Sequence, residues 1–111
     1  MLSRAEFHVL LSLLESDRHG YGIMREVERQ TDGQLSPGAG SLYAALQRLQ
    51  DDGLIEEATS RASDSANGQQ AQRRYYALTP RGWDVLRHEL RQLDVILERA
   101  RANPKLRKGL T

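Results

Sequence analysis

The sequence contains no cysteine, which excludes disulfides and thiolate chemistry and indicates a reducing compartment. Aromatic residues make up only 5% of its 111 residues, so we expect a core built mainly from Leu, Ile, Val and Ala. No apolar run is long enough to cross a bilayer, and the charges at Arg4, Glu6 and Glu15 do not suit a signal peptide. These absences predict a single cytoplasmic domain that has no membrane partner.

Positive charge is scarce in the first half of the chain and concentrated in the second. Residues 1–35 and 36–58 carry net charges of −2 and −3, whereas residues 59–79 and 80–111 carry +2 and +4, within a formal total of +1. Any contact with phosphate groups is therefore expected mainly from the second half.

Apolar residues at helical spacing predict three short helices in the first half. Ser3 and Glu6 match an S-x-x-E capping box at the start of the first helix, and the polar segment 17–20 is predicted to be a turn. Gly53 is suited to end the third helix, because glycine adopts a left-handed backbone at little cost. Three helices with a brief connection between the last two favour a helix-turn-helix. We expect these helices at about residues 4–15, 21–31 and 41–52.

The second half predicts two strands and one long helix. Residues 54–59 and 74–78 are expected to form strands, the latter because of its tyrosines. Residues 61–72 show no apolar period and are expected to form a basic loop, which makes the two strands a wing. Thr79 and Pro80 suit the cap and first position of a helix that ends before Pro104. That helix carries an apolar seam of Trp83, Leu86, Leu90, Leu93 and Leu97.

We interpret the chain as one structural domain, mainly α with a small two-stranded β wing. This is a winged helix-turn-helix with a C-terminal dimerisation helix. The seam is longer than a three-helix core of this size can cover, so we expect a homodimer in which it packs against its two-fold mate and the partner's first helix. The predicted dimer contacts are Leu10, Leu13, Leu14, Leu86, Leu90, Leu93 and Leu97. The predicted parts are a DNA-binding region (1–79), the dimerisation helix (80–104) and a basic tail (105–111).

Four motifs follow one another at consistent distances. They are HGYGI at 19–23, GSLYAAL at 40–46, RL at 48–49 followed by GLI at 53–55, and RRYYALT at 73–79 with Gly82. In these motifs the chain resembles the short form of the PadR family of bacterial transcriptional regulators. The resemblance implies a winged-helix fold, a C-terminal helix that builds the dimer, operator binding and, often, derepression by a small molecule.

The outward face of the third predicted helix is polar and slim, as a helix in the major groove must be. Any surface helix has a solvated face, but the following wing and the family resemblance favour DNA reading. The wing arginines suit phosphate or the minor groove, although Arg73 and Arg74 could merely protect an edge strand. Gly20 and Tyr21 open the second helix, where backbone amides can hold a phosphate, or they are a turn glycine and a core tyrosine. The predicted DNA-binding residues are Gly20, Tyr21, Ser41, Tyr43, Ala44, Gln47, Arg48, Arg61, Arg73 and Arg74.

The remaining candidate sites have simpler interpretations. Trp83 could line a site for a small aromatic effector, but a core anchor for the last helix is the simpler reading. His8, His19 and His88 are far apart in sequence and lack a ligand spacing, so no metal or other cofactor is expected. No arrangement of residues points to catalysis, and we do not expect an enzyme.

The sequence therefore predicts a DNA-binding transcriptional regulator that binds a roughly palindromic double-stranded operator, as a repressor released by a small molecule. The alternative is a winged-helix module that binds protein rather than DNA. Near-zero net charge and the acidic residues Asp51, Asp52, Glu56 and Glu57 support that alternative.

Overall fold

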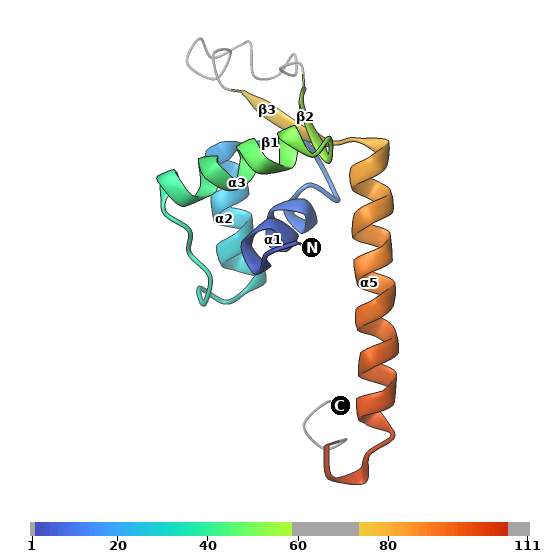
Figure 1. The fold of residues 1–111 in the computed structure, drawn as a ribbon. Helices are drawn as coiled ribbons and strands as arrows, with labels where there is room; N and C mark the ends of the chain where they lie inside the picture. Colours follow the sequence, from blue (N-terminus) through green and yellow to red (C-terminus); the bar gives the residue numbers. More distant parts are fainter. Residues whose placement is uncertain (1, 59–73, 107–111) are drawn as a thin grey trace.

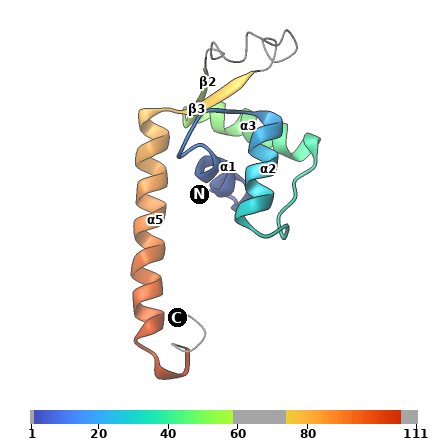
Figure 2. The ribbon, with the colours of Figure 1, turned by 180° about the vertical axis from the view of Figure 1, so that it is seen from behind.

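The computed structural model describes residues 2–58 and 74–106. Helices α1, α2 and α3 form a small body with a three-stranded sheet at one end, and α5 descends from the sheet beside α1 and continues past it (Figures 1 and 2). In chain order the elements are α1 (Arg4–Ser12), β1 (Arg18–His19), α2 (Gly20–Gln30), α3 (Ala39–Asp51), β2 (Ile55–Ala58), β3 (Tyr75–Leu78) and α5 (Pro80–Arg101).

The capping box predicted for the first helix is confirmed. The Glu6 amide donates to Ser3 Oγ at 3.1 Å, and the Ser3 amide donates to Glu6 Oε1 at 2.8 Å. Helix α1 ends at Ser12, earlier than the apolar spacing predicted. Ser12 Oγ donates to the Val9 carbonyl at 2.6 Å, and Arg18 Nε donates to the Ser12 carbonyl at 2.6 Å. These bonds satisfy carbonyls at the helix end, so the chain can turn towards β1.

The sheet has three strands rather than the two predicted. The strand order is β1-β3-β2, and both pairings are antiparallel, with Arg18 opposite Tyr76 and Ile55 opposite Leu78. The segment 17–20, predicted to be a turn, contains β1 and the first residue of α2. A strand of two residues is too short to show an alternating pattern, so its pairing with β3 was not visible in the sequence.

The other helix ends follow the predicted chemistry. Thr79 Oγ1 accepts from the Gly82 amide at 3.0 Å, and Pro80 occupies the first helical position of α5. Gly53, with φ of +74°, follows α3 in the left-handed conformation expected for it. His19 caps α2, because its Nδ1 accepts from the Gly22 amide at 3.1 Å.

The core is mainly aliphatic, as expected, and includes the inner face of α3. Its largest fully buried side chains include Leu10, Ile23, Leu42, Leu46, Leu49 and Leu86. Leu10 and Leu13 are 0% and 3% exposed and lie in this core. The expectation that they contact a partner subunit is therefore corrected, because apolar spacing shows which residues avoid water but not which surface covers them. Leu86 is likewise covered by the chain's own core.

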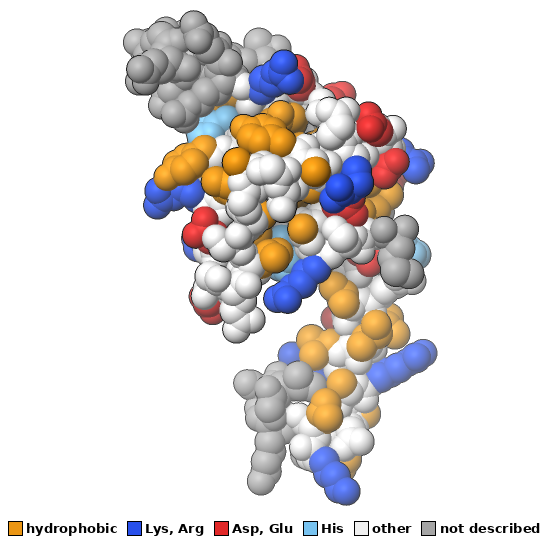
Figure 3. All heavy atoms as spheres, turned by 60° about the vertical axis from the view of Figure 1, so that its left-hand side comes forward, with side chains coloured by type: hydrophobic (Ala, Val, Ile, Leu, Met, Phe, Trp, Pro, Cys, Tyr) orange, Lys and Arg blue, Asp and Glu red, His pale blue; other side chains and the backbone are white. Residues whose placement is uncertain are grey.

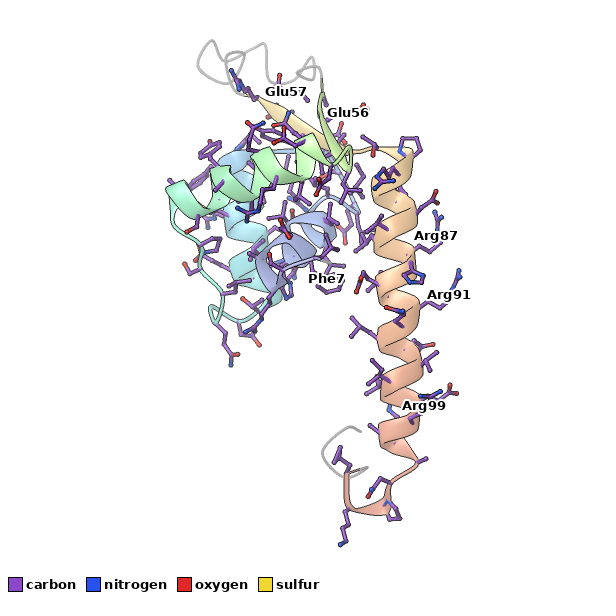
Figure 4. The ribbon with its side chains drawn as sticks, in the orientation of Figure 1. Phe7, Glu56, Glu57, Arg87, Arg91 and Arg99 are labelled. Carbon is purple, nitrogen blue, oxygen red and sulfur yellow. The ribbon has the colours of Figure 1, made fainter. Side chains whose placement is uncertain are left out.

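Beyond Leu86, α5 leaves the helical body and exposes apolar side chains. Leu90 and Leu93 are 38% and 47% exposed, and Ile96 is 60% exposed. Figure 4 shows Arg87, Arg91 and Arg99 on the side of α5 that faces away from α1. Within residues 2–58 and 74–106, no helix combines the length and apolarity that a membrane span requires.

Truncating a side chain should change the free energy of unfolding by very different amounts on the two faces of α3. Leu46 is 1% exposed, and Leu46→Ala should lower the free energy of unfolding by about 2–5 kcal/mol, because it leaves a cavity. Gln47→Ala, at the next residue on the exposed face, should change it by less than about 0.5 kcal/mol. Urea denaturation of both variants at one protein concentration tests this, and equal losses would contradict the assigned orientation of α3.

Candidate functional site

The candidate site is the solvent-facing side of α3 together with the start of α2. Every α3 residue predicted to face outward is exposed, whereas Leu42, Ala45, Leu46 and Leu49 are buried. Figure 3 looks onto the side of the body that lies at the left in Figure 1. There, hydrophobic side chains gather near the middle, with Lys and Arg side chains around them. The exposed α3 residues are Ser41, Tyr43, Ala44, Gln47 and Arg48.

Tyr43 and Gly20 bring α3 and the start of α2 together. A Cβ at Gly20 would lie 2.6 Å from the Tyr43 hydroxyl and 3.1 Å from its Cζ. Gly20 is buried, and Tyr43 remains 54% exposed above it. Glycine at position 20 is therefore needed for the close approach of the Tyr43 side chain, a reason that the motif alone did not reveal.

Tyr21 lies beside this contact and is also more than half exposed, so it is not the core tyrosine that the alternative reading required. Its ring stacks with His19 at 6.4 Å between centroids. Its hydroxyl accepts from Arg25 at 3.1 Å, and the Arg25 guanidinium lies 5.7 Å from the ring centroid. The hydrogen bond to Tyr21 raises the pKa of Arg25 above its usual range. Sequence reasoning missed Arg25, although its i,i+4 spacing from Tyr21 is a usable signal.

Arg48 faces outward, but a carboxylate on α1 holds its head group. Arg48 Nε donates to Glu6 Oε2 at 2.9 Å, across 42 residues of sequence. Burial alone would raise the pKa of Glu6, but hydrogen bonds from the Ser3 amide and from Arg48 outweigh it and lower this pKa. Glu6 thus caps α1 and ties it to α3 through Arg48 Nε, while the Arg48 side chain stays 56% exposed.

The wing side of the site contains both signs of charge. Arg74 pairs with Glu57 on β2 at 3.4 Å, and both side chains are about half exposed or more. Figure 4 shows Glu56 and Glu57 at successive positions of β2, on either side of the strand. Burial raises the pKa of Tyr76 on β3. Arg61 and Arg73, predicted to contact phosphate, lie outside the described residues.

Comparison with known proteins establishes the family. The model of the transcriptional regulator PadR-like family matches residues 9–88, well over half of the chain. The chain belongs to this family. The PadR-like family is a family of transcriptional regulators.

Curated relatives are longer than this PadR-like chain. The chain is 30% identical over 112 residues to the transcriptional regulator YqjI of Escherichia coli (strain K12). The aligned region covers 92% of the chain and 50% of that protein. It is 34% identical over 74 residues to an uncharacterized protein of Lysinibacillus sphaericus, over 67% of the chain and 63% of that protein. The chain thus spans about half the length of the Escherichia coli regulator.

Solved structures share the fold. A PadR family regulator of Clostridium difficile R20291 has a TM-score of 0.70 and 24% identity, over 86% of this chain and 93% of that one. RosR of H. salinarum has a TM-score of 0.64 and 26% identity, over 98% and 86%. Bacillus subtilis PadR, solved in complex with operator DNA, has a TM-score of 0.66 and 22% identity, over 81% and 48%.

The Glu6 ion pair predicts how the stability of this PadR-like chain depends on pH. Because folding lowers the pKa of Glu6, its stabilising effect is present above the ordinary value of 4.5 and is lost as the pH falls through the lowered value. Glu6→Gln should lower the free energy of unfolding at neutral pH and flatten its fall on acidification. Urea denaturation at a series of pH values tests this, with Glu98→Gln on the exposed half of α5 as control. An unchanged pH profile in Glu6→Gln would contradict the assignment.

Proposed function

We propose that this PadR-like chain is a transcriptional regulator that binds double-stranded DNA, with α3 in the major groove. The observation that carries the proposal is the exposed, narrow and polar face of α3, set beside a winged sheet in a chain of this family. An α-helix fits the major groove and reads base edges through hydrogen bonds. Bacillus subtilis PadR, which shares the fold, was solved with operator DNA.

Base reading is assigned to uncharged side chains of α3. Ser41, Tyr43 and Gln47 supply hydrogen-bonding groups on the exposed face, and Ala44 keeps that face slim. Arg48 is assigned a structural role, because its guanidinium is already bonded to Glu6.

Phosphate binding is assigned to cations outside α3. Arg25 projects from α2 beside Tyr21, held by a phenol rather than by a carboxylate. Gly20 and Tyr21 belong to the first turn of α2, one turn before Arg25, and backbone amides at a helix start favour anions. The arginines of the predicted wing, Arg61, Arg73 and Arg74, complete the set, and Arg74 is also paired with the exposed Glu57. Affinity and its salt dependence should therefore come from α2 and the wing, and discrimination from α3.

The division of roles predicts two classes of variant. Tyr43→Ala and Gln47→Ala should narrow the affinity gap between a selected operator and random DNA, since one good base contact discriminates by about 1–3 kcal/mol. Arg25→Ala and Arg73→Ala should weaken both duplexes alike and lower the slope of log K against log salt by about one. Binding titrations at several salt concentrations measure both effects.

A matched control for these variants is Arg87→Ala, which removes an arginine from the side of α5 that faces away from α1. It should leave the salt slope unchanged. If Arg48→Ala lowers the slope while Arg25→Ala and Arg73→Ala do not, the division of roles is wrong.

The proposed active form is a homodimer on a roughly palindromic operator. Leu90, Leu93 and Leu97 lie on one side of α5 at helical spacing, and Leu90 and Leu93 are exposed beyond the helical body. Leu14, which is 37% exposed in the bend after α1, is the remaining member of the predicted contact set. Burying a leucine fully contributes about 1.5–3 kcal/mol, so a few per subunit suffice to hold a dimer. Two-fold symmetry then requires matching half-sites about one helical turn apart.

The dimer seam predicts that a buried charge dissociates the protein. Leu90→Asp should yield monomer, because an unpaired carboxylate would be desolvated at the seam. His88→Asp places the same charge on the opposite face of α5, where it should leave the dimer intact. Light scattering of both variants, with circular dichroism to confirm folding, decides this. A Leu90→Asp variant that remains a folded dimer would refute the proposed seam.

Repression and its release by a small aromatic effector remain predictions. Trp83 is 39% exposed in the first turn of α5, so a planar compound could reach its ring. The competing function is a protein-binding module, favoured by the exposed pair Glu56 and Glu57 on β2. A gel shift at low salt with the DNA upstream of the protein's own gene separates the two functions, since a protein-binding module would leave that DNA unshifted.

A further inference from the structure

The first turn of α5 lies directly against the backbone that leaves α3. Gly82 is buried, and a Cβ there would lie 2.0 Å from the Leu54 carbonyl oxygen and 3.0 Å from its carbon. A third contact, at 3.3 Å, is with Leu78 Cδ2. The obstacle is backbone rather than the end of a flexible side chain, so a larger residue at position 82 forces one of the two segments to move.

Hydrogen bonds to three successive carbonyls reinforce this contact. Arg81 Nε donates to the Asp52 carbonyl at 3.1 Å, Thr79 Oγ1 donates to the Gly53 carbonyl at 2.6 Å, and the Thr79 amide donates to the Leu54 carbonyl at 3.1 Å. The Thr79 hydroxyl also accepts from the Gly82 amide, so one side chain caps α5 and joins it to the end of α3. We call residues 52–54 and 79–82 the α3–α5 joint.

From this geometry we propose that the α3–α5 joint, and Gly82 in particular, sets the spacing of operator half-sites that the protein accepts. The inference rests on the proposed function. In that function α3 reads bases and α5 holds the two subunits together, so the angle between these helices fixes how far apart the two α3 helices lie. The joint connects them through backbone atoms, which leaves little freedom in that angle.

The length of α5 amplifies a small change at the joint. Relieving the contact of a Cβ with the Leu54 carbonyl requires a shift of about 1 Å. Leu86, the next buried contact of α5, lies about 6 Å further along the helix, so this shift corresponds to a tilt of about 10°. At Leu97, about 17 Å beyond Leu86, the same tilt displaces the seam by about 3 Å. That is close to the rise of one base pair, about 3.4 Å.

The test compares half-site binding with spacing preference. Duplexes carry inverted copies of the half-site that the wild-type protein selects from random DNA, with their separation varied in steps of one base pair. Gly82→Ala should bind a single half-site as the wild type does. Its preferred separation should move by about one base pair, with about tenfold weaker binding at the wild-type separation. Asp84→Ala, an exposed substitution in the same turn, should keep the wild-type preference.

A second pair of variants tests the joint without added bulk. Thr79→Val removes the hydroxyl and should broaden the range of accepted separations, whereas Thr79→Ser keeps the hydroxyl and should retain the wild-type range. A folded, dimeric Gly82→Ala with the wild-type preference would overturn the inference. If Gly82→Ala does not fold, identical ranges for the two Thr79 variants would overturn it. Failure of the wild type to bind DNA would instead refute the proposed function.

Discussion

Helix α3 buries Leu42, Leu46 and Leu49 against α1 and α2, while its opposite face stays open to solvent. The rest of the structure depends on this division, because a small chain with few aromatic residues must use every helix as core. The inner stripe fixes the rotation of α3 about its own axis, and that rotation decides which side chains face outward. A polar residue on the inner stripe would therefore affect the outer face as well as stability.

Several polar groups of the structure serve two elements at once. Glu6 caps α1 and also binds Arg48 on α3, and the Thr79 hydroxyl caps α5 and also binds the Gly53 carbonyl. His19 lies in β1, caps α2 through Nδ1, and packs its ring in a T-shaped arrangement with that of Tyr75 on β3, with 5.4 Å between the centroids. Each group satisfies a helix end, as buried backbone requires, and fixes the position of that end relative to a neighbouring element. A small domain gains in this way a precise arrangement of helices from few residues.

The sequence predicts those features that depend on neighbours along the chain. Capping residues and apolar spacing located the helices within a few residues, and the inner and outer faces of α3 were assigned correctly. Features that depend on distant residues were missed: the pairing of β1 with β3, the Glu6–Arg48 ion pair, the contact of Gly20 with Tyr43, and the fit of Gly82 to the Leu54 carbonyl. Leu10 and Leu13 show the same limit, since their spacing marks them as buried but does not say by which surface. The structural role of a glycine or an apolar residue depends on the residues that it contacts, and a single sequence does not identify those contacts.

The arrangement of charge has a consequence for how a protein of this kind distinguishes DNA sequences. Contacts with phosphate raise affinity for all DNA, whereas contacts with base edges raise it for one sequence. An unpaired cation on α3 would add a contact with phosphate at the surface that is proposed to read base edges. In the proposed function, pairing Arg48 with Glu6 reduces that contribution and makes the guanidinium a support between two helices. Arg25 is held by the Tyr21 hydroxyl at the edge of the site, and in the proposed function it contacts phosphate without occupying the reading face. In the proposed function the two properties are carried by different elements, so affinity can change through α2 and the predicted wing while the sequence read by α3 stays the same.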